Sequence, residues 1–150
     1  MELLTQSSSQ TQKAGQRFSA DLTPLPDKAT ILALSGDMGS GKTTFAQGIG
    51  QGLGIKKRII SPTFIIMRKY TTDSNRTKFK FFYHIDLYRL EGNISKELQN
   101  LGLTDEMQNP DNILCIEWAE KAKDSLPTSS IWLSFRAIGE NKHQITSQNT

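Results

Sequence analysis

Cysteine and histidine are scarce in this 150-residue chain, which contains one cysteine, Cys115, and two histidines. A single cysteine excludes a disulfide within the chain and any zinc site built on cysteine ligands. No apolar run reaches the roughly 18 residues of a membrane-spanning helix. The N-terminal stretch MELLTQSSSQ lacks the basic segment and apolar core of a secretory signal. We therefore expect a cytoplasmic protein that has no membrane as a partner.

A large excess of charge of one sign is also lacking, because 18 Lys and Arg face 15 Asp and Glu, for a net charge of +3. A balance this close to neutral does not by itself indicate a nucleic-acid-binding protein. The run Lys56-Lys57-Arg58 follows a predicted helix. Such a short run is more typical of a solvated cap that complements the helix dipole than of a nucleic-acid patch. DNA is not an expected partner, and a direct contact with RNA stays open as the weaker alternative.

The length and the pattern of segments predict one domain, residues 1–150, of the α/β class. Short apolar runs typical of buried strands alternate with helix-like repeats, which indicates a central mixed β-sheet flanked by helices, with antiparallel hairpins. The predicted strands cover residues 2–5, 29–34, 63–70, 79–87, 112–117, 131–138 and 143–147. Helices are predicted through Ala14, Phe18 and Leu22, over 43–53, and as short pieces within 93–108, where Leu98, Leu101 and Leu103 are expected to face inward.

The predicted helix over residues 43–53 contains Gly48, Gly50 and Gly52. Each glycine costs a helix about 1 kcal/mol relative to alanine. We expect close packing of this helix against the sheet to compensate for that cost.

The sharpest feature is the segment GDMGSGKT, which begins at Gly36 and matches the pattern G-x-x-x-x-G-K-[ST] in full. It follows a predicted buried strand and opens a predicted helix, which is the setting of the phosphate-binding loop of P-loop NTPases. Glycines let backbone N–H groups converge on phosphate oxygens, and the helix adds the positive end of its dipole. The predicted nucleotide-binding residues are Gly36, Asp37, Met38, Gly39, Ser40, Gly41, Lys42, Thr43 and Thr44.

Within this loop Lys42 is expected to reach the β- and γ-phosphates, and the Thr43 hydroxyl is expected to ligate Mg²⁺. Hydrolysis also needs an acidic group near the metal, and Glu117 directly follows the apolar strand Ile113–Ile116. Asp86 lies two residues after His84 on a predicted strand, so their side chains share a face. Asp86 is a candidate for orienting water, although the residues alone are equally consistent with a structural role for this pair.

ATP is the expected nucleotide. A guanine-reading Asn-Lys-x-Asp motif is missing, because the similar string NKHQ at Asn141 lacks the carboxylate and falls in a predicted hairpin turn. The arginines are scattered and no arginine finger is evident, so we expect slow hydrolysis that a partner accelerates. Two alternatives remain at this stage: a small-molecule kinase, and a nucleotide-gated binding module without significant turnover.

Four motifs in order resemble the bacterial TsaE (YjeE) family, the ATPases of tRNA threonylcarbamoyladenosine (t⁶A) biosynthesis. They are GDMGSGKTT (Gly36–Thr44), SPTF (Ser61–Phe64), HIDLYRL (His84–Leu90) and IEWAEK (Ile116–Lys121). The loop alone occurs in a very large superfamily, whereas its combination with the other three motifs is far more specific.

The resemblance implies a Mg²⁺-dependent ATPase that assists a threonylcarbamoyl transferase built from TsaD-like and TsaB-like proteins. It implies that tRNA is met indirectly, through that complex, and that ATP and Mg²⁺ are the cofactors. Residue by residue, it implies that Thr43 and Glu117 serve the metal and that Asp86 and Glu117 serve hydrolysis. It also places Thr63 in a switch-like catalytic segment near the γ-phosphate, and Trp118 beside the site.

Overall fold

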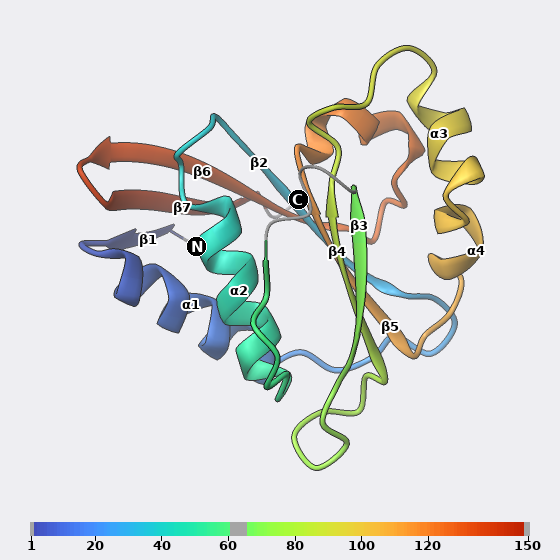
Figure 1. Ribbon diagram of the computed structural model, residues 1–150, viewed down its shortest axis with the longest axis horizontal. Helices are drawn as coiled ribbons and strands as arrows, with labels where there is room; N and C mark the ends of the chain where they lie inside the picture. The colour runs from blue at the N-terminus through green and yellow to red at the C-terminus, as the bar shows by residue number, and fades with distance from the viewer. Residues whose placement is uncertain (1, 61–65, 149–150) are drawn as a thin grey trace.

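Among the residues that the structure describes, 2–60 and 66–148, seven strands form one mixed β-sheet in the order β1-β7-β6-β2-β5-β4-β3 (Figure 1). The structure is a computed structural model. Its elements are β1 (Glu2–Thr5), α1 (Ser8–Ala20), β2 (Thr30–Gly36), α2 (Lys42–Gly52), β3 (Met67–Thr71), β4 (Phe81–Asp86), α3 (Ile94–Asn100), α4 (Leu103–Glu106), β5 (Asn112–Glu117), the 3₁₀-helix η1 (Ala119–Ser125), β6 (Ile131–Gly139) and β7 (Lys142–Gln148). In these ranges no helix combines the length and the apolar character that crossing a membrane requires.

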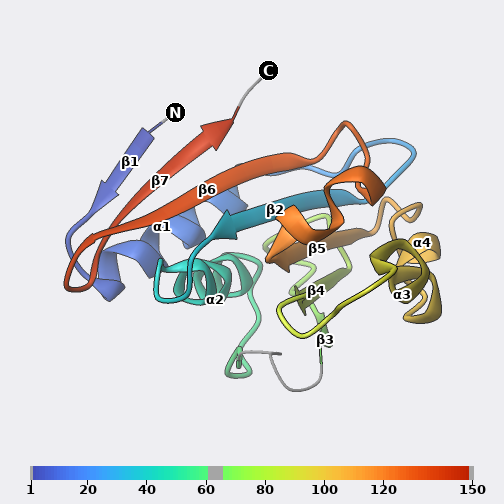
Figure 2. The same ribbon diagram turned by 90° about the horizontal axis from the view of Figure 1, so that it is seen from above.

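Helices cover both faces of the sheet, α1 and α2 on one and α3, α4 and η1 on the other (Figures 1 and 2). Successive residues of β2 therefore contribute to different cores. Leu32 and Leu34 pack in the cluster under α1 and α2, whereas Ile31 and Ala33 pack in the cluster under α3, α4 and η1. A strand buried on both faces is typical of the parallel centre of an α/β sheet. The predicted mixed sheet flanked by helices is confirmed.

The central strands run parallel, which brings their carboxyl ends to one edge of the sheet. β2 lies parallel to β5 and β6, and β4 lies parallel to β5. In register, Leu34 lies opposite Glu117, and Glu117 lies opposite Asp86. The turn after β2 and the carboxylates of Asp86 and Glu117 therefore lie at the same edge of the sheet. Ligands of open α/β sheets bind at this edge.

Glycines let α1 and α2 approach each other closely. A Cβ atom on Gly48 would lie 2.0 Å from the carbonyl oxygen of Gln12, and one on Gly52 would lie 2.0 Å from a side-chain oxygen of α1. A Cβ atom on Gly50 would lie 2.9 Å from Ile59, in the segment that follows α2, and 3.4 Å from Phe82 of β4. The expected packing against the sheet therefore holds in part for Gly50 and is wrong for Gly48 and Gly52, which pack against a helix.

The ends of the remaining elements differ modestly from the sequence prediction. Of the strand predicted for residues 63–70, the structure describes β3, and residues 61–65 lie outside the described residues. Leu98 and Leu103 are buried as predicted, whereas Leu101 is half-buried. The 3₁₀-helix η1 was not predicted, because its short polar segment carries no apolar repeat.

Candidate nucleotide-binding site

The turn between β2 and α2 adopts backbone conformations that favour glycine. Gly36, Gly39 and Gly41 have φ angles of 139°, 78° and 101°, and side chains are strained at such angles. Two of these positions are also crowded. A Cβ atom would lie 2.4 Å from the Phe135 carbonyl oxygen at Gly36 and 3.0 Å from the His143 ring at Gly41. The glycines predicted from the motif are thus required by the shape of the loop.

The loop and the start of α2 leave polar groups available to an anion. The N-cap residue of α2, Gly41, has no side chain to accept from the free N–H groups of the first turn. The Ser40 hydroxyl oxygen is buried without a hydrogen-bond partner in the described part of the chain. Such a group costs about 1–3 kcal/mol, and a bound phosphate oxygen would remove that cost. The buried hydroxyl and the helix start together fit a phosphate group.

The Lys42 side chain is buried and folds back over the loop. Its Nζ donates hydrogen bonds to the carbonyl oxygens of Gly36 and Asp37 and lies 3.9 Å from the centre of the Trp118 ring. Burial lowers the pKa of Lys42, and nearby carboxylates, Glu120 foremost, oppose this shift. Because hydrogen bonds between two charged groups are stronger than those to neutral carbonyls, a phosphate would compete well for this ammonium.

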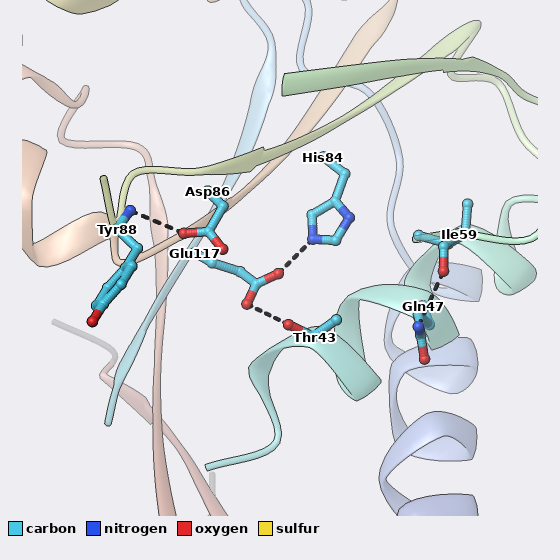
Figure 3. Close-up of polar contacts among 7 residues, drawn as sticks. All are labelled: Thr43, Gln47, Ile59, His84, Asp86, Tyr88 and Glu117. Atoms are coloured by element: carbon cyan, nitrogen blue, oxygen red, sulfur yellow. Dashed lines mark hydrogen bonds and ion pairs between the residues drawn. The ribbon is translucent and has the colours of Figure 1, made fainter. Parts of the chain in front are cut away.

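Glu117 connects β5 with α2 and β4 through both of its carboxylate oxygens (Figure 3). The Thr43 hydroxyl donates to Oε1 over 2.7 Å, and Nε2 of His84 lies 2.6 Å from Oε2. A carboxylate has no hydrogen to give, so Nε2 is the donor. His84 is fully buried, and its Nδ1 has no partner among the residues described. His84 does not line the pocket described below, and its hydrogen bond joins it to Glu117, which does.

Asp86 ends β4 directly beside Glu117. Its Oδ1 accepts a hydrogen bond from the backbone N–H of Tyr88 over 2.9 Å (Figure 3), and the residue is buried. Asp86 and Glu117 therefore place two carboxyl groups on adjacent strand ends opposite the loop. These two carboxylates would stabilise a cation bound beside the loop.

These groups line one pocket of about 270 Å³ at the carboxyl edge of the sheet. The sequence-predicted residues that line it are Met38, Gly39, Ser40, Gly41, Lys42, Thr43, Thr44, Asp86, Glu117 and Trp118. Gly36 and Asp37 shape the loop without lining the pocket. Thr63 lies outside the described residues, so its role stays a prediction.

Four lining residues were not singled out as site residues from the sequence: Ser8, Tyr88, Asn141 and His143. Three of them come from α1 and from the β6–β7 hairpin, which lie beside the loop only after the sheet has formed. The buried His143 is held in place by Thr11, whose hydroxyl oxygen lies 3.1 Å from its Nδ1 and 2.6 Å from the Thr5 hydroxyl. No local motif predicts this arrangement. The only local signal is Asn141 in a tight turn, with a φ of 58°.

No group of three or more His, Cys, Asp and Glu side chains in the described ranges could hold a metal ion by itself. Mg²⁺ usually takes only one or two protein carboxylates and completes its shell with water and substrate phosphates. Thr43 and Glu117, whose oxygens lie 2.7 Å apart beside the loop, match that type of site.

Comparisons with known proteins agree with the motifs and the fold. A family model described as threonylcarbamoyl adenosine biosynthesis protein TsaE matches residues 5–145. The tRNA threonylcarbamoyladenosine biosynthesis protein TsaE of Haemophilus influenzae is 37% identical over 81% of this chain and 72% of its own length, and that of Rickettsia bellii is 33% identical over 94% and 90%. The crystal structure of YdiB from Bacillus subtilis gives a TM-score of 0.74 at 26% identity, over 98% of this chain and 83% of that one. The chain therefore belongs to the TsaE family of threonylcarbamoyl adenosine biosynthesis proteins.

Proposed function

We propose that this protein binds ATP with Mg²⁺ and hydrolyses it as an accessory factor of tRNA t⁶A modification, acting with TsaD-like and TsaB-like proteins. The proposed binding of ATP and Mg²⁺ rests on one observation: the Thr43 hydroxyl oxygen lies 2.7 Å from Oε1 of Glu117, beside the phosphate-binding loop. The pathway is supported by the relatives, which are named as proteins of tRNA threonylcarbamoyladenosine biosynthesis.

In this proposal each residue of the pocket has one task. When bound, Mg²⁺ neutralises phosphate charge that develops during transfer. Lys42 exchanges its carbonyl partners for phosphate oxygens, while Ser40 and the N–H groups at the start of α2 hold the remaining oxygens. Glu117 and the Thr43 hydroxyl serve the metal side. Asp86 orients the attacking water.

Partner-dependent hydrolysis is supported by what the pocket lacks. None of the described residues that line it is an arginine. In related phosphoryl-transfer sites an arginine supplied by a partner raises the rate about 10³–10⁵-fold. We therefore expect slow hydrolysis by the protein alone and faster hydrolysis in the assembled complex.

The kinase alternative is disfavoured by the relatives, which are named as proteins of tRNA threonylcarbamoyladenosine biosynthesis and not as kinases. A phosphorylated metabolite formed in a substrate screen would revive this alternative.

The deciding experiment is multiple-turnover tRNA modification with the TsaD-like and TsaB-like proteins, with and without this protein. We expect modification to continue past the first turnover only when the protein and ATP are both present. In parallel, phosphate release is measured for the wild type, Asp86→Asn and Glu117→Gln, with Lys123→Gln, at an exposed position of η1, as a control. Losses of about 10²-fold or more in the two site variants are expected. Equal modification without the protein would refute the accessory role, and unchanged phosphate release would refute the site.

A further inference from the structure

The modest net charge conceals a strong asymmetry along the chain. Residues 54–80 contain eight Lys and Arg and a single acidic residue, Asp73, whereas the other 123 residues contain ten Lys and Arg and fourteen Asp and Glu. One segment is thus strongly basic while the rest of the chain is acidic on balance. A clustered charge of this kind is the electrostatic signature of a polyanion-binding surface.

The fold enlarges this basic segment into a surface. Three grooves adjoin one another: Ile55, Lys56 and Lys57 line both the first and the second, and Gln51 lines both the second and the third. We call their cationic lining the basic surface; it consists of Arg17, Lys56, Lys57, Arg58, Lys69 and Arg76. Among residues 2–60 and 66–148, Asp73 is the one carboxylate that lines any of the three grooves. Arg17 belongs to α1, so its proximity to the others follows from tertiary structure.

Two of the three grooves include the C-terminal end of α2, at Gln51 and Gly52, which is the end opposite the phosphate-binding loop (Figure 1). With 11 residues at 1.5 Å each, α2 separates this end from the loop by about 16 Å. The β3–β4 loop is anchored there, because the Asp73 N–H donates to the Leu53 carbonyl oxygen over 3.1 Å. A Cβ atom on Gly54 would lie 2.4 Å from that of Asp73. The surface is therefore built on packed backbone.

Lys69 lies over the Phe81 ring, with its Nζ 4.1 Å from the ring centre, and the six cations share one feature, which is the lack of a carboxylate partner among the described residues. Among the residues with described positions, none of the six has a carboxylate oxygen within 4.0 Å of its charged nitrogens. The run Lys56–Arg58 begins four residues beyond the end of α2 at Gly52, and the last turn of α2 contains no basic residue. The interpretation of this run as a helix cap is therefore not supported. Its charges point to an external partner.

We propose that the basic surface binds the phosphate backbone of a structured RNA. Neutral hydrogen-bonding side chains stand between the cations, among them Gln12, Gln16, Ser74 and Asn75, and such side chains commonly contact phosphate and sugar. A protein partner would need an apolar centre. None of the exposed large hydrophobic residues described lines the three grooves. The charge pattern indicates a polyanion and does not depend on the proposed function. The choice of RNA over another polyanion rests on the proposed role in tRNA modification.

The test measures binding of unmodified tRNA to the full chain by fluorescence anisotropy, without nucleotide, from 50 to 200 mM salt. Each lysine–phosphate contact contributes about 1 to the slope of log affinity against log salt. Lys56→Gln/Lys57→Gln should therefore reduce that slope by about 2 and weaken binding about tenfold at 100 mM salt. Arg17→Gln/Arg76→Gln should do the same, because the proposal requires both parts of the surface.

The matched control is Lys96→Gln/Lys123→Gln, which removes two exposed lysines from α3 and η1. It changes the net charge equally and should alter affinity by less than about twofold. An equal loss in this control, or no measurable binding by the wild type, would overturn the proposal. So would variants of the basic surface that bind tRNA normally but fail to bind the TsaD-like or TsaB-like proteins, since the surface would then serve a protein. Because no nucleotide is present, failure here is distinct from failure of the proposed ATPase.

Discussion

Replacing His84 with phenylalanine tests whether a buried side chain behind the pocket controls Glu117. His84 is fully buried and stacks on Phe82, with ring centres 6.2 Å apart and planes 19° apart. Phenylalanine keeps the planar shape and this stacking. It removes the donor that lies 2.6 Å from Glu117 Oε2. The change therefore removes one hydrogen bond with little repacking.

Two effects of His84→Phe on stability oppose each other. Losing a hydrogen bond to a charged group costs about 1.5–3 kcal/mol, and removing the buried Nδ1, which has no described partner, regains about 1–3 kcal/mol. The free energy of unfolding should thus change by no more than about 2 kcal/mol. Activity should respond more strongly, because Glu117 keeps only the Thr43 anchor. Losing a group that orients a metal ligand commonly costs about 10–100-fold in metal affinity or activity.

The assays are urea unfolding and phosphate release as a function of Mg²⁺ concentration, with the partner proteins present. We expect near-normal unfolding for His84→Phe, with the Mg²⁺ dependence shifted about 10–100-fold. His84→Gln retains an N–H donor near the position of Nε2 and should restore most of the Mg²⁺ dependence. Normal Mg²⁺ dependence in His84→Phe would refute the positioning role. A loss of more than about 3 kcal/mol of stability would show that His84 is mainly structural.

Three further predictions follow from buried groups away from the pocket. Gly48→Ala should lower the free energy of unfolding by about 1–2 kcal/mol in urea titrations. The added Cβ atom would lie 2.0 Å from the Gln12 carbonyl oxygen, and the cost of this overpacking exceeds the roughly 1 kcal/mol gained in helix propensity. A stabilised variant would contradict the close packing of α1 and α2. Burial and the hydrogen bond to Glu106 raise the pKa of Tyr83 to about 12, so its contribution to stability is complete below about pH 10 and is lost as the pH rises towards 12. Tyr83→Phe should flatten this alkaline loss, and an unchanged profile would contradict it. Cys115 is fully buried and its pKa is raised, so it should react with a thiol reagent only at the rate of unfolding; fast labelling of the folded protein would show that β5 opens locally.

The site residues that the sequence predicts well are those whose chemistry depends on their immediate neighbours. Gly36, Gly39 and Gly41 are needed for left-handed backbone angles, and Lys42 and Thr43 follow at fixed spacing because the loop leads directly into α2. A short motif contains all of this information. The carboxylates Asp86 and Glu117 were predictable for a related reason, because strand ends next to a buried apolar run meet at one edge of a parallel sheet.

Tertiary structure decided which distant segments complete the site and what surrounds it. The bonds from Thr43 and His84 to Glu117 depend on the register of α2, β4 and β5, which no local pattern specifies. His143 reaches the loop only because β7 lies next to β1 and α1. The basic surface likewise joins Arg17 of α1 to the segment that follows α2. Local backbone chemistry can be read from sequence, whereas contacts between distant segments are set by the strand order and helix packing of the whole chain.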